Sequence, residues 1–142
     1  MPIAERLHLR IHVEIGLSEW LNREWFPVAP ELLSLEDLAQ RVPAIDLAYR
    51  SRGEARHGET GEEALERSGA TALRLVREFT GNLVFVGHGA SVLGATAGLL
   101  GKEGKSLPLD LPYACLICVV ETDGGFRLEH GASTSHLKAL GA

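Results

Sequence analysis

His88 is the residue of this sequence whose surroundings are best suited to chemistry. Four apolar residues, 83–86, precede Gly87, His88 and Gly89. The apolar run predicts a strand buried on both faces, and the glycines allow a tight turn into a helix over residues 90–100. Helix starts carry free N–H groups and a positive dipole end, which attract anions. His88 and Gly89 are therefore candidate ligands of an anionic group, and a histidine that only happens to lie in a turn is the alternative.

The composition limits the classes of partner and compartment. The chain has 142 residues, 45% of them hydrophobic, and a formal net charge of -5. This balance predicts one soluble domain and argues against binding to nucleic acids or anionic membranes. No signal peptide and no apolar run long enough to span a membrane is visible, so a cytoplasmic protein is expected.

Two cysteines form the only pattern that resembles a metal motif. Cys115 and Cys118 are separated by two residues inside an apolar run that predicts a strand. Alternation along a strand sends these two side chains to opposite faces, and nothing nearby supplies further ligands. We therefore expect no metal and no cofactor.

The remaining elements follow from apolar periodicity and from capping and turn residues. Helices are predicted near residues 2–9, over 18–26 after Ser18, over 34–38 after the capping residue Ser34, and from Thr60 or Gly61 to Phe79. Strands are predicted over 10–14, 83–86, 114–121 and 126–130, the last two joined at Asp123 and Gly124. Residues 43–61 and 102–112 are predicted as loops, and the tail 131–142 as partly ordered.

Helices that alternate with strands and end in a hairpin indicate an α/β class. We predict a layered α/β/α domain with a mixed, mostly parallel sheet. Residues 1–142 are predicted to form a single domain, because no repeat or linker divides them.

Several segments resemble, in the same order, the histidine phosphatase (phosphoglycerate-mutase-like) superfamily. They are residues 13–20, 34–38, 44–50, 58–60 and 84–89, extended by 99–101, 111–118 and 130–132. The likeness is closest to the phosphatase domain of the TULA or Sts proteins and to ecdysteroid-phosphate phosphatases. It covers most of this chain but only the C-terminal portion of the family's domain. The resemblance therefore implies a histidine-phosphatase-like fold that is truncated at its N-terminus.

The resemblance also implies two-step transfer of a phosphoryl group. In the family, an Arg-His-Gly motif after the first strand supplies the nucleophile, and a second arginine, a second histidine and an acid complete the pocket. Glu14 matches the acid that protonates the leaving oxygen, and His88 matches the second histidine that holds the phosphoryl oxygens. Both are implied catalytic residues, and His88 with Gly89 would bind the phosphate.

The family's nucleophile motif is expected before Pro2, outside this sequence. Residues 56–60 read Arg-His-Gly-Glu-Thr, but the preceding residues 51–55 are polar and have no strand character. Residues 58–60 also match the family's opening of the helix before the central strand. His57 is thus predicted to be a loop histidine, with the nucleophile as its alternative role.

Two functions follow. The first is a phosphomonoester hydrolase acting on phosphotyrosine proteins or small phosphate esters, impaired because its nucleophile is lost or supplied by another chain. The second is a noncatalytic pseudophosphatase that binds phosphate or phosphopeptides. Loss of a central first strand would leave edges unpaired, so we predict either direct pairing of 10–14 with 83–87 or a homodimer that shields them.

Overall fold

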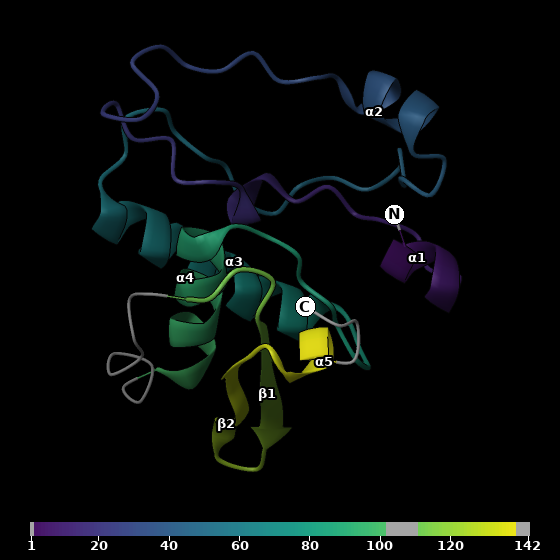
Figure 1. Ribbon diagram of the computed structural model, residues 1–142, viewed down its shortest axis with the longest axis vertical. Helices are drawn as coiled ribbons and strands as arrows, with labels where there is room; N and C mark the ends of the chain where they lie inside the picture. The colour runs from purple at the N-terminus through teal and green to yellow at the C-terminus, as the bar shows by residue number, and fades with distance from the viewer. Residues whose placement is uncertain (1, 102–110, 139–142) are drawn as a thin grey trace.

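The computed structural model describes residues 2–101 and 111–138 of the chain. Its elements are α1 (Pro2–Leu7), η1 (Ile15–Leu17), α2 (Leu35–Arg41), α3 (Gly61–Glu78), α4 (Gly89–Leu100), β1 (Leu116–Thr122), β2 (Gly125–Ser133) and α5 (Ser135–Lys138). Figure 1 shows α3 and α4 packed side by side, with the β1–β2 hairpin at one end and the long irregular segments before α3 on the other side. The helix pair is therefore the centre of the structure.

The helix predicted to begin at Thr60 or Gly61 is confirmed as α3. Its N-terminus has the reciprocal capping box, in which Glu63 N donates to Thr60 Oγ1 at 3.2 Å and Thr60 N donates to Glu63 Oε2 at 2.7 Å. These two bonds satisfy backbone donors that the helix itself leaves free. The buried residues of α3 are mostly small: Ala64, Ser68, Gly69, Thr71, Ala72 and Leu75.

Glycines let α3 and α4 approach each other closely. A Cβ atom on Gly98 would lie 2.4 Å from Gly69 Cα, and one on Gly94 would lie 2.6 Å from Leu65 O. Both obstacles are backbone atoms, which cannot turn away as a flexible side chain can. The separation of the two helices, and with it the position of the α4 N-terminus, is therefore fixed by these small residues.

We expect Gly98→Ala to lower the free energy of unfolding by about 1–3 kcal/mol, because the new methyl group forces the helices apart. This loss exceeds the gain of about 1 kcal/mol that alanine brings to a helix interior. Gly124→Ala is the control, since a Cβ at Gly124 meets no described atom within 4 Å. Urea unfolding of both variants measures the effect; an equal stability of the two would contradict the packing argument.

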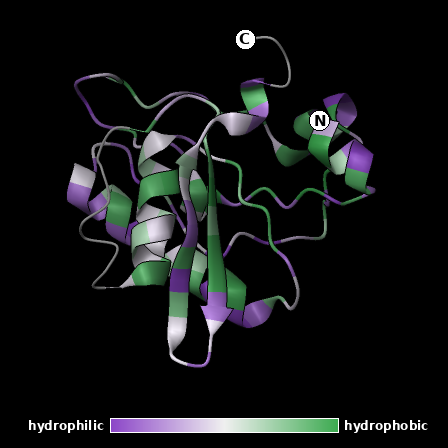
Figure 2. Cartoon of the chain, turned by 60° about the horizontal axis from the view of Figure 1, so that its bottom comes forward, coloured by the Kyte–Doolittle hydropathy of each residue, from purple (hydrophilic) through white to green (hydrophobic). Residues whose placement is uncertain are grey.

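The predicted C-terminal hairpin is confirmed. β1 and β2 pair antiparallel, from Leu116 opposite Ser133 to Thr122 opposite Gly125, with the tight turn at the predicted Asp-Gly pair. Figure 2 shows that hydrophobic residues concentrate in β1 and α4, whereas β2 is more polar. In the described part of the tail that was predicted to be partly ordered, β2 continues to Ser133 and α5 follows it.

The mixed, mostly parallel sheet is not formed by the described residues. Their one sheet is the two-stranded hairpin. Residues 83–87 are extended but pair with no other described strand, and Val84 and Val86 are 55% and 67% exposed, so the prediction of a buried central strand was wrong for this chain. Apolar residue types alone cannot bury a strand that has no neighbour.

The predicted strand over residues 10–14 is reduced to a single bridge. Ile11 pairs in parallel with Ile45, through Ile11 N to Ala44 O at 2.8 Å and Asp46 N to Ile11 O at 2.9 Å. The predicted loop therefore supplies the partner of this segment. Direct pairing of residues 10–14 with residues 83–87 does not occur in the described part of the chain.

The helix predicted over residues 18–26 was wrong. The short helix η1 ends at Leu17, before this segment, and residues 18–26 form a loop with a turn over residues 23–25. Side chains take the backbone groups that a helix would need: Glu19 Oε1 accepts from Trp20 N at 2.7 Å, and Asn22 Oδ1 accepts from Trp25 N at 2.9 Å. Such local bonds offer the backbone an alternative to the helical ladder.

The other predictions concern shorter segments. The cap at Ser34 is confirmed, since its hydroxyl accepts from Asp37 N at 3.0 Å at the start of α2. Most of the predicted loop over residues 102–112 lies outside the described residues. Cys118 lies in β1 and Cys115 just before it, and both are free and half-buried.

Candidate functional site

His88 caps the N-terminus of α4. Its N–H donates to Ser91 Oγ at 3.0 Å, and the Ser91 hydroxyl donates back to His88 O at 3.1 Å. Gly87 is needed beside this pair, because a Cβ there would lie 2.5 Å from Ser91 Oγ. The His88 side chain is 61% exposed, and Gly89, the first residue of α4, is exposed as well, so the ring and this end of the helix are open to solvent.

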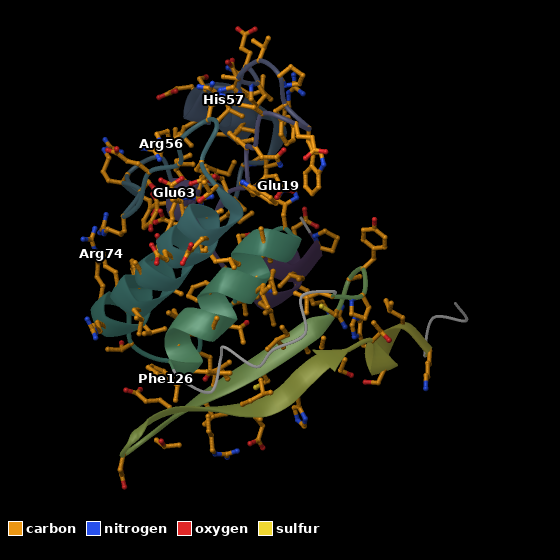
Figure 3. The ribbon with its side chains drawn as sticks, turned by 90° about the vertical axis from the view of Figure 1, so that its left-hand side faces the viewer. Glu19, Arg56, His57, Glu63, Arg74 and Phe126 are labelled. Carbon is orange, nitrogen blue, oxygen red and sulfur yellow. The ribbon has the colours of Figure 1, made fainter. Side chains whose placement is uncertain are left out.

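A carboxylate lies against the His88 ring. Glu19 Oε2 is 3.0 Å from His88 Nδ1, and Glu19 Oε1 accepts the N–H of Trp20. Both carboxylate oxygens are therefore engaged, one by the backbone and one by the imidazole. Figure 3 shows Glu19 at the end of the helix pair, between α4 and the loops that carry His57.

A buried ion pair fixes the segment that carries Glu19. Arg67 of α3 binds Glu59 through two bonds, Nε to Oε2 at 3.0 Å and NH2 to Oε1 at 2.5 Å. These two side chains are only 10% and 4% exposed. Arg67 also donates to the carbonyl oxygens of Gly16 at 2.9 Å and of Ser18 and Glu19 at 3.4 Å. One side chain thus attaches residues 16–19 to α3.

Glu14 lies near the other end of the same segment, in a separate cluster of hydrogen bonds. Its Oε1 accepts hydrogen bonds from Gly16 N (2.8 Å), Ser51 Oγ (2.6 Å) and Gly53 N (3.0 Å). Its Oε2 accepts from Tyr49 OH at 2.5 Å and from Arg52 N at 2.8 Å. Five donors therefore converge on one carboxylate and tie residues 49–53 to the start of η1.

These donors determine the charge of the pocket. Burial disfavours the carboxylate of Glu14, but the hydrogen bonds from Ser51, Tyr49 and the backbone of Arg52 and Gly16 outweigh it and lower its pKa. Burial and the hydrogen bond to Glu14 raise the pKa of Tyr49, which stays a phenol. Glu14 is ionised at neutral pH in this arrangement, which favours anchoring of the loop over donation of a proton.

His57 lies in the loop layer, not at the end of a strand. Residues 51–55 form no strand, and one ring nitrogen of His57, Nε2, lies 2.7 Å from Phe26 O. The adjacent Gly58, in a left-handed conformation, donates its N–H to Leu21 O at 2.7 Å. His57 thus joins two loops, and Figure 3 shows it well separated from Glu19.

A family comparison shows to which group of proteins this chain belongs. The profile described as "Histidine phosphatase superfamily (branch 1)" matches residues 1–134. The chain belongs to the histidine phosphatase superfamily. The resemblance read from residues 13–20 and 84–89 is thereby confirmed.

Two curated proteins are similar to this chain. The Ecdysteroid-phosphate phosphatase of Drosophila melanogaster is 29% identical over 131 residues, which cover 84% of this chain and 17% of the relative. The human Ubiquitin-associated and SH3 domain-containing protein A is 31% identical over 99 residues, which cover 66% of this chain and 15% of the relative. The chain thus spans less than a fifth of the length of either relative.

Sequence reasoning missed Glu19 and the ion pair that fixes its segment in this histidine phosphatase chain. Glu19 was predicted to lie in a helix, and neither Arg67 nor Glu59 was singled out. Arg67 and Glu59 are eight positions apart, so no helical pair of the usual spacing signals their contact. Glu59 lies just before α3 and Arg67 lies within it, so their buried contact is recognisable only once the fold is known.

Other kinds of site find no support in the described residues. No group of three or more His, Cys, Asp or Glu side chains there could hold a metal ion. No described helix is both long and apolar enough to cross a membrane.

Proposed function

We propose that this chain carries the second-histidine side of a phosphomonoester hydrolase pocket, with His88 and Gly89 binding the phosphoryl group. The observation that carries the proposal is the place of His88 in a histidine phosphatase chain. His88 is exposed, it is the N-cap residue of α4, and its Nδ1 contacts the carboxylate of Glu19. The Drosophila relative is named for a phosphate ester, which supports phosphomonoesters as the substrate class.

The chemistry of the pocket follows from its donors. A protonated His88 offers Nε2–H to one phosphoryl oxygen, while the first N–H groups of α4 and the helix dipole face the others. Donors that are already in place when negative charge grows on the transferring phosphoryl group stabilise the transition state. Inorganic phosphate, the product, would occupy the same place.

We still propose Glu14 as the general acid of the family's reaction, but its hydrogen bonds must change before it can carry a proton. A general acid must carry a proton, but five donors keep this carboxylate ionised. Glu14 could protonate a leaving oxygen only after Tyr49 or Ser51 releases it. Its anchoring role needs no such rearrangement.

The proposal places the nucleophile on a strand that pairs with residues 83–87. This segment is extended and unpaired in the described part of the chain, and it borders a groove of about 900 Å³ lined by apolar residues that include Leu17, Phe79 and Phe85. An added strand there would complete a parallel sheet and the α/β/α layers. In this proposal the chain is the C-terminal portion of one cytoplasmic phosphatase domain, and a homodimer is the alternative way to cover the edge.

A noncatalytic phosphate-binding or phosphopeptide-binding module is the second candidate. The observation that favours it is the engagement of His57 with Phe26 O, away from Glu19. Among the described residues, no ion pair or ring contact joins another histidine to His88. A chain that binds phosphate through His88 but has no nucleophile would act as a pseudophosphatase.

A phosphate titration and a turnover assay distinguish these functions. Both are made on three proteins: the wild type, His88→Ala and His57→Ala. NMR titration with inorganic phosphate should move the His88 ring signals in the wild type, and affinity should fall about tenfold or more in His88→Ala, which removes a charged hydrogen bond. Hydrolysis of p-nitrophenyl phosphate then reports turnover. Binding without turnover supports the noncatalytic module, and turnover lost in His57→Ala would assign the nucleophile to His57. No response of His88 at high millimolar phosphate would contradict both functions.

A further inference from the structure

Glu19 is connected on three sides, unlike an ordinary surface carboxylate. Its Oε1 accepts the N–H of Trp20, its Oε2 lies 3.0 Å from His88 Nδ1, and its main-chain carbonyl accepts from Arg67. The Glu19 side chain is 29% exposed, half the exposure of the His88 ring. The backbone therefore fixes the carboxylate independently of its contact with the histidine.

We propose that Glu19 is the positioning residue of His88: it holds the ring by Nδ1 and thereby directs Nε2 to the ligand. The proposal rests on the proposed function for the role of Nε2, but the His88–Glu19 contact itself does not depend on it. Glu19 acts through the imidazole and touches no reacting atom. The carboxylate binds Nδ1, which leaves Nε2 for the phosphoryl group of the proposed function.

The first consequence concerns the tautomer of His88. A neutral imidazole has one N–H, and the hydrogen bond made by one nitrogen determines which nitrogen carries it. A carboxylate can only accept, so Glu19 places the hydrogen on Nδ1. The neutral ring then presents the lone pair of Nε2 to solvent, and protonation adds its hydrogen at Nε2, where the phosphoryl oxygen is expected.

The second consequence concerns the orientation of the ring. An exposed histidine without a partner rotates among several rotamers, and binding must then immobilise it. Glu19 is fixed by Trp20 N and by the Arg67–Glu59 pair, and it holds the His88 ring in one orientation. The ring is therefore already immobilised in the free protein. The affinity for phosphate therefore contains a contribution that disappears when the carboxylate is removed.

The test compares Glu19→Ala and Glu19→Gln with Glu24→Ala, which removes an exposed glutamate of the neighbouring turn. Nitrogen-15 NMR of the His88 ring reads the tautomer without any ligand. We expect one Nδ1–H tautomer in the wild type and in Glu24→Ala, and a mixture in Glu19→Ala. Glu19→Gln keeps an oxygen acceptor and should partly restore the Nδ1–H form.

Phosphate titration of the same variants gives the second readout. The dissociation constant should rise about three- to tenfold in Glu19→Ala, as expected for one freed side chain and one lost ion pair, and should stay unchanged in Glu24→Ala. An unchanged tautomer and an unchanged affinity in Glu19→Ala would overturn the proposal. If the wild type binds no phosphate, the proposed function fails, and the tautomer comparison alone still decides the role of Glu19.

Discussion

Arg67→Met is expected to lower the free energy of unfolding by about 3–5 kcal/mol, because it leaves the Glu59 carboxylate buried without its counter-charge. The Glu59 side chain is only 4% exposed, so water cannot replace the guanidinium. Three main-chain carbonyls between Gly16 and Glu19 lose their donor as well. Domains of this size are stabilised by about 5–15 kcal/mol, so the loss is a large fraction of the total.

Urea unfolding followed by tryptophan fluorescence measures this effect directly. Trp20 donates its indole N–H to Glu59 O at 2.8 Å and therefore reports on the neighbourhood of the ion pair. Arg77→Met is the matched control, since Arg77 is an exposed arginine of the same helix, and it should change the stability by less than about 0.5 kcal/mol.

The double variant Arg67→Met/Glu59→Met separates the unpaired charge from the lost contacts. It should be more stable than Arg67→Met alone, because no buried charge is left without a partner. Equal stabilities of Arg67→Met and Arg77→Met would show that the ion pair does not hold residues 16–19 to α3. In that case the position of Glu19 would need another explanation.

The sequence predicted correctly those elements that are held by hydrogen bonds between residues close in the chain. The helix cap at Ser34, the capping box at Thr60 and the Asp-Gly turn at residues 123–124 each place their bonds within a few positions of one another. Residues 83–87 show the limit of such signals. Their types favour a buried strand, but burial depends on a neighbouring strand that the described residues do not supply.

The candidate site also combines residues that the nearby sequence reveals with residues that depend on contacts between distant parts of the chain. Gly87, His88 and Gly89 were identified because a turn and a helix start are local features of the sequence. The contacts of Arg67 with Gly16 and Glu19 span 51 and 48 positions, and no periodicity encodes them. Glu19 was missed for a related reason. The apolar residues of the segment 18–26 have helical spacing, which predicted a helix, but Arg67 binds the main-chain carbonyls of Ser18 and Glu19 instead.

Glu14→Gln is expected to destabilise the fold by about 1–3 kcal/mol, the cost of a backbone N–H left without an acceptor. Oε1 faces the N–H groups of Gly16 and Gly53, and Oε2 faces the N–H of Arg52. The amide of glutamine has only one oxygen, so either orientation turns an NH2 group towards a backbone donor. Because Glu14 is half-buried, water relieves part of the cost, and the lower end of the range is expected.

The pH dependence of stability identifies the charge as the cause. The pKa of Glu14 is lowered in the folded state, so its stabilisation is complete above the ordinary value of 4.5 and is lost as the pH falls through the folded value. The stabilities of the wild type and Glu14→Gln should therefore differ most at neutral pH and converge below about pH 4.5. A difference that stays constant from pH 7 to pH 3 would contradict an ionised anchor, because it would mean that folding leaves the pKa of Glu14 unchanged. A difference that grows as the pH falls from 7 towards 4.5 would mean a raised pKa and a protonated Glu14, as a general acid of the phosphatase pocket requires.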